Sequence, residues 1–501
     1  MYGKIVGMRK IMDLKIGQIQ EACGGKLALQ KGVCPEQKVN GVTLDSRQIT
    51  NGEVFVAVGG NRVDGHKFVM QAFARGASLV VTEKTPKQVE EEHGVSAEAW
   101  GSYLLVENSL QALKDMAEFY RKTLRIPFVG ITGSVGKTST KEFIAAVLGE
   151  KYSVLKTEGN YNNEIGVPLT LLRIRREHQA AVVEMGISDF GEMHRLSKMV
   201  RPDICVITNI GQCHLENLGS RDGILKAKSE IFDFMAEDGA VCLYGGDDKL
   251  RTIRQVKGKR PCFFGLGESR QEEAYATDIA GCGLWGSNAL LHLKRGDGEE
   301  TIRIHIPLPG RHMVINAAGA ACVGMLLGLT KEEIREGVGK AAAVNGRSRL
   351  LRLKHYTLID DCYNANPVSM RAAIDLLSMA DTGKTAILGD MFELGENSDA
   401  LHSETGAYAA LAGIDRIYCV GENSLHMYRA ALKTAKENQR VLYFRDRNQL
   451  FDALSGKKEA ADRPLIPWGD TILLKASHGM KFSELIEKCF LVGEISVGNN
   501  A

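Results

Sequence analysis

The sequence lacks a long apolar run and has almost no net charge. Its longest apolar runs, such as 127–132 and 203–210, are of strand length and fall far short of the roughly 20 residues that a bilayer-spanning helix needs. The 63 Lys and Arg residues nearly balance the 61 Asp and Glu residues, which leaves a net charge of +2. Bulk charge therefore gives no reason to expect a nucleic acid or a membrane surface as a partner, and any anion site must be local.

The cysteines lack a pairing pattern, and the N-terminus lacks an export signal. Eleven cysteines are scattered singly, with no CxxC pair and an odd total, which is typical of reduced thiols. Cys213 and Cys362 lie inside motifs described below, where packing is the simpler interpretation. Residues 1–17 carry charges but no continuous apolar stretch followed by a cleavage site. We expect a cytoplasmic protein without membrane insertion, and a monomer, although the sequence carries no direct signal for oligomeric state.

A chain of 501 residues exceeds what one hydrophobic core usually organises, so its length favours about three domains. Short β-like runs alternate with helical stretches throughout, which indicates the α/β class. We expect domain boundaries at 1–123, 124–343 and 344–501. The segment 455–464 is expected to be an exposed loop.

The middle and last parts show the clearest element order. A strand at 127–132, a Gly-rich turn and a helix at 137–150 come first, and strands follow at 180–185 and 203–210. This order predicts a mostly parallel central sheet, with an antiparallel insertion around 245–305 before a helix at 314–328. The last part predicts a doubly wound, Rossmann-like domain with strands at 357–361, 384–389, 416–421 and 471–475.

The strongest chemical signal is the glycine-rich loop 130–140 (GITGSVGKTST), which lies between a predicted strand and a predicted helix. Glycines let several backbone N–H groups and the positive helix N-terminus point at one anion. A glycine-rich turn that binds no ligand is the simpler alternative. The position of GKT between a strand and a helix disfavours this alternative. Five residues rather than the usual four separate Gly130 from Gly136. The loop predicts ATP binding by Thr132, Gly133, Ser134, Val135, Gly136, Lys137 and Thr138, with Lys137 neutralising phosphate and Thr138 binding Mg²⁺.

The loop and many other segments resemble the Mur ligase family, in which TGSVGKT is an expected form and the extra residue is normal. The resemblance covers almost the entire chain, in order. NYNNEIG (160–166) and YNANP (363–367) point to the family member that adds D-alanyl-D-alanine. The other matching segments are 43–68, 181–193, 208–220, 226–232, 309–321 and 388–395.

This resemblance implies an ATP-dependent amide ligase of peptidoglycan precursor synthesis. Its substrates would be UDP-N-acetylmuramoyl-tripeptide and D-alanyl-D-alanine, and its products the UDP-muramoyl-pentapeptide, ADP and phosphate. A carboxylate is a poor acyl donor until one oxygen becomes a phosphate, so ATP would form an acyl phosphate that the dipeptide amine attacks. Both steps bring anions together, so Mg²⁺ and fixed cations are needed to offset the repulsion.

Three residues beyond the phosphate loop are candidates for holding two magnesium ions with Thr138. Glu184 ends a predicted strand, where a hard carboxylate oxygen faces the ligand crevice of a parallel sheet. The resemblance assigns His214 to a second magnesium and Lys228 to the lysine that reacts with CO₂ to form a carbamate. From the residues alone, His214 would be a structural histidine, and Lys228 a solvated lysine like Lys226. Because a lysine must be neutral to react, we expect its site to lower its pKa.

The resemblance places further nucleotide contacts in the second half of the chain. Asn316 would contact adenine through its amide, with helix capping as the alternative role. Arg347 would reach the γ-phosphate, where a guanidinium fits well, and Arg349 is its competitor. Asp361 would contact the ribose or the metal environment. The expected catalytic set is Lys137, Lys228, Arg347 and His214.

Three groups of polar residues are expected to hold the substrates. Turn formation is the competing explanation for the segment NRVDGH. His478 lies in the segment KASHGM, which resembles a family loop that often has arginine at this position. The charged contact that the resemblance would assign to that arginine is therefore not expected of His478. The candidates are Asp45, Ser46, Arg47, Arg62, Asp64, Gly65 and His66 for the uridine nucleotide, Asn160, Asn162 and Asn163 for sugar, phosphate or peptide, and Tyr363, Asn364 and Asn366 for framing the cleft.

Two alternatives remain at this level. The first is another Mur or folylpolyglutamate-type ligase with a different acceptor, against which the DSR segment and NYNNEIG argue. The second is a regulatory protein that uses the nucleotide loop as a switch. The joint presence of Glu184, His214, Lys228 and Arg347 argues against it. Whether the tripeptide carries lysine or diaminopimelate is not encoded in these motifs.

Overall fold

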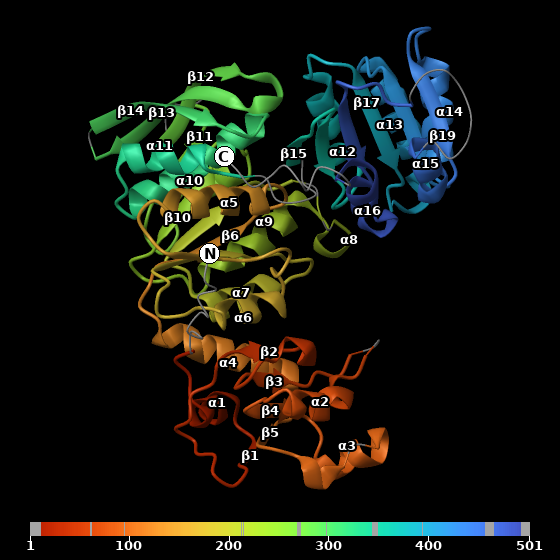
Figure 1. Cartoon of the computed structure of the whole chain (residues 1–501). Helices are drawn as coiled ribbons and strands as arrows, with labels where there is room; N and C mark the ends of the chain where they lie inside the picture. Colours follow the sequence, from red (N-terminus) through yellow and green to blue (C-terminus); the bar gives the residue numbers. More distant parts are fainter. Residues whose placement is uncertain are drawn as a thin grey trace, which may run out of the picture. The chain divides into compact units, whose positions relative to one another are not determined.

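The computed structural model contains three β-sheets with covering helices, in agreement with the α/β prediction (Figure 1). It describes residues 12–60, 63–94, 96–211, 213, 215–267, 272–296, 298–342, 349–392, 394–455 and 465–491. Within these ranges no helix is both long and apolar enough to cross a membrane. The chain forms two compact units, one made of Met1–Thr277, Leu290–Arg303 and Ile315–Lys340 and the other of Asp278–Ala289, Ile304–Val314 and Ala341–Ala501.

The first sheet has the strand order β1-β5-β4-β3-β2. Its strands β2 to β5 are parallel and β1 is antiparallel to β5. Thr85 and Asn108 cap the two helices that follow β4 and β5. The strands are β1 (Lys26–Ala28), β2 (Val42–Thr43), β3 (Val54–Val56), β4 (Leu79–Thr82) and β5 (Tyr103–Leu105), and the helices are α1 (Ile16–Cys23), α2 (Val69–Ala74), α3 (Pro86–His93) and α4 (Ser109–Thr123), with 3-10 turns η1 (Ser46–Gln48), η2 (Gly65–Phe68) and η3 (Ala97–Ala99).

The central sheet has the order β14-β13-β12-β11-β10-β9-β6-β8-β7. The strands from β7 across to β12 are parallel, and β6 and β8 are buried at every position, as their continuous apolar sequences predict. Only two residues separate β13 from β14, which requires an antiparallel hairpin. The strands are β6 (Phe128–Thr132), β7 (Val154–Lys156), β8 (Ala180–Glu184), β9 (Ile204–Ile207), β10 (Ala240–Tyr244), β11 (Cys262–Gly265), β12 (Ala274–Gly281), β13 (Ser287–Arg295) and β14 (Gly298–Ile306).

The helices of the central part pack on this sheet and on α4. One hydrophobic core runs from the first sheet through α4 to the central sheet. The buried Tyr120 hydroxyl of α4 donates to Ile174 O at 2.8 Å, which ties the two sheets into one unit. The helices are α5 (Lys137–Leu148), α6 (Gly166–Leu171), α7 (Glu192–Val200), α8 (Leu215–Leu218), α9 (Arg221–Ser229), α10 (Arg311–Leu326) and α11 (Lys331–Gly339), with 3-10 turns η4 (Glu230–Phe232), η5 (Leu250–Thr252) and η6 (Gly283–Trp285).

The third sheet has the order β15-β16-β20-β17-β18-β19, and only β15 is antiparallel to its neighbour. Separate hydrophobic clusters cover its two faces, which confirms the doubly wound prediction. The strands are β15 (Arg349–Arg352), β16 (Thr357–Asp361), β17 (Lys384–Gly389), β18 (Arg416–Val420), β19 (Arg440–Phe444) and β20 (Thr471–Lys475), and the helices are α12 (Pro367–Ser378), α13 (Ser398–Leu411), α14 (Ser424–Thr434), α15 (Arg447–Leu454) and α16 (Ser483–Leu485), with η7 (Gly395–Asn397), η8 (His478–Met480) and η9 (Ile486–Leu491).

Candidate active site

The phosphate loop connects β6 to α5 at the carboxyl edge of the central sheet. Gly133 has φ +146°, and Gly136, which precedes the helix, has φ +83°. A Cβ on Gly133 would lie 2.0 Å from Thr208 Oγ1, so only glycine fits there. The Thr208 hydroxyl donates to Val135 O at 2.6 Å, and Val135 N donates to Asn209 Oδ1 at 3.0 Å. The loop is therefore held against the residues that follow β9.

Lys137 and Thr138 occupy the first turn of α5, where the helix N-terminus favours an anion. The Lys137 ammonium donates to Gly133 O at 2.8 Å and thus lies over the loop. The Thr138 hydroxyl donates to Glu184 Oε1 at 3.1 Å. Glu184 ends β8, the strand beside β6, so the sheet brings the loop and this carboxylate together.

The two carboxylate oxygens of Glu184 have different surroundings. Oε1 accepts hydrogen bonds from Thr138 and from Asn162 Nδ2, the latter at 2.9 Å. Oε2 is buried and has no hydrogen-bond partner among the described residues. Leaving a buried carboxylate oxygen without a hydrogen bond is costly, and a hard divalent cation could coordinate it. Glu184 and Thr138 therefore fit a magnesium site, whereas the predicted ligand His214 lies outside the described residues.

Lys228 lies in α9 with only 1% of its surface exposed. Burial, followed by the positive charge of Lys137, lowers the pKa of Lys228 to about 8. The predicted lowering is present, and the solvated lysine of the simpler interpretation is wrong. Cys213, expected to be a packing residue, places its thiol 3.1 Å from Ser134 Oγ, against the phosphate loop. The carbamate on Lys228 stays a prediction.

Asn316 lies inside α10, several residues after the helix begins at Arg311, so capping is not its role. The residue is 7% exposed, and its Oδ1 accepts a hydrogen bond from Thr140 Oγ1 of α5 at 3.1 Å. A Cβ on Gly136 would lie 3.6 Å from the same oxygen. The amide is thus positioned beside the phosphate loop.

The three asparagines of NYNN occupy different positions. Asn162 donates to Glu184 and so belongs to the metal site as much as to the substrate-binding set. Asn163 Oδ1 accepts from the N–H of Gly166, the first residue of α6, at 2.9 Å. Asn160 is exposed. Nothing in the sequence indicated that Asn162, rather than its neighbours, would contact Glu184.

In the first sheet, the uridine candidates follow β2 and β3. Asp45 accepts from Arg47 N at 2.9 Å and pairs with the Arg47 guanidinium, while Ser46 Oγ donates to Gln71 Oε1 at 2.6 Å. A Cβ on Gly65 would lie 2.8 Å from Val58 N, so this position has no room for a side chain. Arg62 lies outside the described residues.

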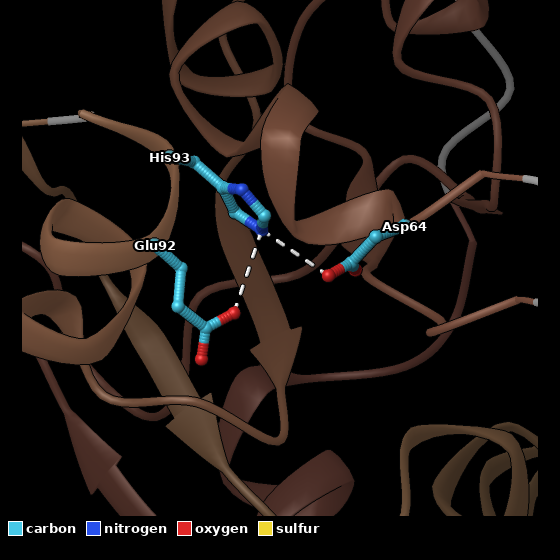
Figure 2. Close-up of side chains that lie close together, drawn as sticks. All are labelled: Asp64, Glu92 and His93. Carbon is cyan, nitrogen blue, oxygen red and sulfur yellow. Dashed lines mark hydrogen bonds and ion pairs between the residues drawn. The ribbon is translucent and has the colours of Figure 1, made fainter.

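Asp64 and His66 form the turn that was their alternative explanation. Asp64 Oδ1 accepts from His66 N at 3.0 Å and lies 2.6 Å from His66 Nδ1, and His66 is fully buried. Asp64, Glu92 and His93 lie close together, and the side-chain atoms through which all three could bind a metal ion are within 4.8 Å of one another (Figure 2). Lys84 already donates to both carboxylates, at 3.0 Å from Asp64 Oδ2, so this cluster has its cation. Partial burial raises the pKa of Asp64, but the hydrogen bonds from His66 and Lys84 outweigh it and hold the pKa well below its usual range.

In the third sheet, the candidates follow β16. Asp361 forms a buried ion pair with Lys475 of β20 at 2.6 Å, and Lys475 also donates to Asn364 O at 3.0 Å. The Tyr363 ring lies 5.9 Å from the His478 ring. Sequence reasoning missed Lys475, although it opens the quoted segment KASHGM.

Two of the remaining third-sheet candidates support local structure, and one lies outside the described residues. Asn366 Oδ1 accepts from Ser369 N at 2.8 Å and caps α12. Asn364 Oδ1 accepts from Ala365 N at 2.8 Å. Arg349, the competitor of Arg347, begins β15 opposite Asp360, whereas Arg347 is not among the described residues.

Comparison with known proteins assigns the family. The model of the Mur ligase family, catalytic domain, matches residues 38–121, the Mur ligase middle domain matches 131–324, and the Mur ligase, glutamate ligase domain, matches 346–478. A UDP-N-acetylmuramoyl-tripeptide--D-alanyl-D-alanine ligase from Bacillus subtilis (strain 168) is 36% identical over 452 residues, covering 90% of this chain and 93% of the relative. The chain belongs to the Mur ligase family. It is accordingly an ATP-dependent ligase that forms an amide bond.

Further relatives and solved structures of Mur ligases are similar to this chain over most of its length. The enzyme of the same name from Escherichia coli (strain K12) is 34% identical, covering 89% of this Mur ligase and 93% of the relative. A crystal structure of MurF from Acinetobacter baumannii has a TM-score of 0.81 and 31% identity, covering 95% of this chain and 99% of that one. MurF from Thermotoga maritima in complex with ADP has a TM-score of 0.70 and 28% identity, covering 89% and 96%. The predicted three-domain Mur ligase architecture is confirmed.

Proposed function

We propose that this Mur ligase joins D-alanyl-D-alanine to the terminal carboxylate of UDP-N-acetylmuramoyl-tripeptide, with conversion of ATP to ADP and phosphate. The observation that carries the proposal is the likeness, over nine-tenths of the chain, to relatives named for these two substrates. The segments NYNNEIG and YNANP support the same acceptor. The enzyme would act in peptidoglycan precursor synthesis, as a monomer in the cytoplasm.

The central sheet supplies the residues for binding and activating ATP. The N–H groups of 133–138 and the Lys137 ammonium would bind the phosphates, and Asn316 would contact adenine. Thr138 and Glu184 would hold one Mg²⁺, and His214 with a carbamylated Lys228 a second. Bound magnesium supplies positive charge that offsets repulsion between the triphosphate and the substrate carboxylate.

The first and third sheets would supply the other contacts. Asp45, Ser46 and Arg47 follow β2 and would hold the uridine nucleotide at the carboxyl edge of a parallel sheet. In the third sheet, Arg347 would reach the γ-phosphate. The residues after β16 and β20 would frame the D-alanyl-D-alanine site. The Asp361–Lys475 ion pair joins the ends of these two strands.

The test is a coupled measurement of ADP release and product mass. We expect ADP release to require both UDP-N-acetylmuramoyl-tripeptide and D-alanyl-D-alanine, with the pentapeptide formed in equal amount. ATP turnover indifferent to those two substrates would support the regulatory alternative instead. Turnover with a folate as the carboxylate substrate and glutamate as the amine substrate would support a folylpolyglutamate-type ligase.

A further inference from the structure

Lys141 is a buried cation for which the reaction described above gives no role. It lies in α5, one turn beyond Lys137, and only 1% of its surface is exposed. Because residues four apart lie on one face of a helix, Lys141 points toward the same sheet edge as Lys137. A buried ammonium is unfavourable unless other groups compensate it. The groups that compensate Lys141 indicate what it does.

Its ammonium contacts β7 and β8. Nζ donates to Thr157 O, directly after β7, at 2.7 Å. Nζ also lies 3.3 Å from Glu142 Oε1 and 3.8 Å from Glu184 Oε2. Thr157 provides a second connection, since its hydroxyl accepts a hydrogen bond from Glu184 N at 3.0 Å. Lys141 and Thr157 therefore contact Glu184 at its Oε2 and its backbone N–H, whereas Thr138 contacts Oε1.

The oxygen that faces Lys141 is the oxygen left for a cation. Glu184 Oε1 accepts hydrogen bonds from Thr138 and Asn162, whereas Oε2 has no hydrogen bond among the described residues. The 3.8 Å separation from Lys141 is too long for a hydrogen bond but short enough for strong attraction between charges at a buried site. The Lys141 ammonium thus lies close enough to balance the charge of Oε2 without donating a hydrogen bond to it.

We propose that Lys141 is a positioning residue that acts as the resident counter-ion of Glu184 and weakens divalent cation binding to the nucleotide-free site. The fixed positive charge stabilises the ionised carboxylate when no metal is bound. The same charge repels an arriving divalent cation, so tight binding requires the extra negative charge of nucleotide phosphates. The inference rests on the proposed function only in taking Glu184 as a metal ligand.

The test compares neutral and charged replacements by Mn²⁺ binding without turnover, measured from the electron paramagnetic resonance signal of free Mn²⁺. Lys141→Gln can still donate to Thr157 O but lacks the charge. We expect it to bind Mn²⁺ about tenfold or more tightly than wild type in the absence of nucleotide, because a nearby repulsive charge has been removed. Lys141→Arg retains the charge and should bind as wild type does.

Lys151 provides the matched control. It follows α5, its ammonium also donates to a carbonyl, Gly328 O, at 2.9 Å, and the residue is exposed. Lys151→Gln removes the same charge away from Glu184 and should leave Mn²⁺ affinity unchanged.

Unchanged or weaker Mn²⁺ binding in a folded Lys141→Gln protein would overturn the proposal. If that variant does not fold, Mn²⁺ binding to wild type is measured with and without a nonhydrolysable ATP analogue. The proposal requires clearly weaker binding without nucleotide, and equal affinity would contradict it. Since no catalysis is measured, failure of the ligase assay would not produce either result, and failure here leaves the ligase proposal standing.

Discussion

Replacement of Gly133 by alanine should weaken ATP binding while leaving the fold intact. Gly133 has φ +146°, a conformation that residues with a side chain rarely adopt. Its new Cβ would lie 2.0 Å from Thr208 Oγ1 and 3.1 Å from Thr208 N. Thr208 cannot move away freely, because its hydroxyl donates to Val135 O at 2.6 Å. The phosphate loop must therefore change conformation.

The expected magnitude follows from two contributions. A side chain at such a backbone conformation costs of order 1–3 kcal/mol, and loss of the Thr208–Val135 hydrogen bond costs about 1 kcal/mol. The loop can escape this cost of roughly 2–4 kcal/mol by leaving its phosphate-binding conformation. ATP affinity should then fall by roughly 30-fold to several hundred-fold, since about 1.4 kcal/mol corresponds to a factor of ten.

Isothermal titration calorimetry with a nonhydrolysable ATP analogue measures this loss, and thermal unfolding checks the fold. Gly296→Ala is the control, because Gly296 has φ +60° with no atom within 4 Å of the added Cβ. It should cost stability without affecting nucleotide affinity. The double variant Gly133→Ala, Thr208→Ala should recover part of the affinity, because it removes the closest clash. Wild-type nucleotide affinity in Gly133→Ala would refute the reasoning.

Three further predictions concern charged residues. Burial lowers the pKa of Lys228 from 10.5 to about 8, so the unfolded chain binds this proton more tightly than the folded chain. In CO₂-free buffer, the free energy of unfolding of wild type relative to Lys228→Met should therefore rise as the pH increases from about 8 to 10.5, and a difference that does not change with pH would contradict this. Lys228→Ala should abolish ligation but leave nucleotide binding. Lys475→Met leaves Asp361 buried without its cation and should lower the free energy of unfolding by about 3–5 kcal/mol in chemical denaturation, whereas a loss below about 1 kcal/mol would show that the pair matters little. Arg347→Ala should impair ADP formation while UDP-substrate binding, measured by calorimetry, stays intact; unchanged activity would direct attention to Arg349.

The elements that the sequence predicted well are those with strong local signals. The strands at 357–361, 384–389 and 471–475 have the predicted bounds, because each contains a short apolar run and pairs with parallel neighbours. The phosphate loop was recognisable because its glycines and GKT lie between a strand and a helix. In contrast, β1 and β7 have three residues each, too few to show a periodic pattern.

The pairings within the site could not be predicted in the same way. Lys475 and Asp361 are far apart in the sequence, and only the adjacency of β20 and β16 brings them together. Lys141 looks like an ordinary helix lysine until the position of β8 shows that it faces Glu184. Asn162 was expected to contact substrate, and its hydrogen bond to Glu184 depends on the path of the loop after β7. Topology, rather than local sequence, determines these contacts.

The central claim is that this chain transfers D-alanyl-D-alanine to a UDP-linked tripeptide. The most direct measurement is mass spectrometry of the purified protein incubated with MgATP, UDP-N-acetylmuramoyl-tripeptide and D-alanyl-D-alanine, with ADP measured in the same samples. The account predicts one pentapeptide product for each ADP and neither product when either substrate is omitted. ADP formation without pentapeptide, or pentapeptide formation without ATP, would contradict it.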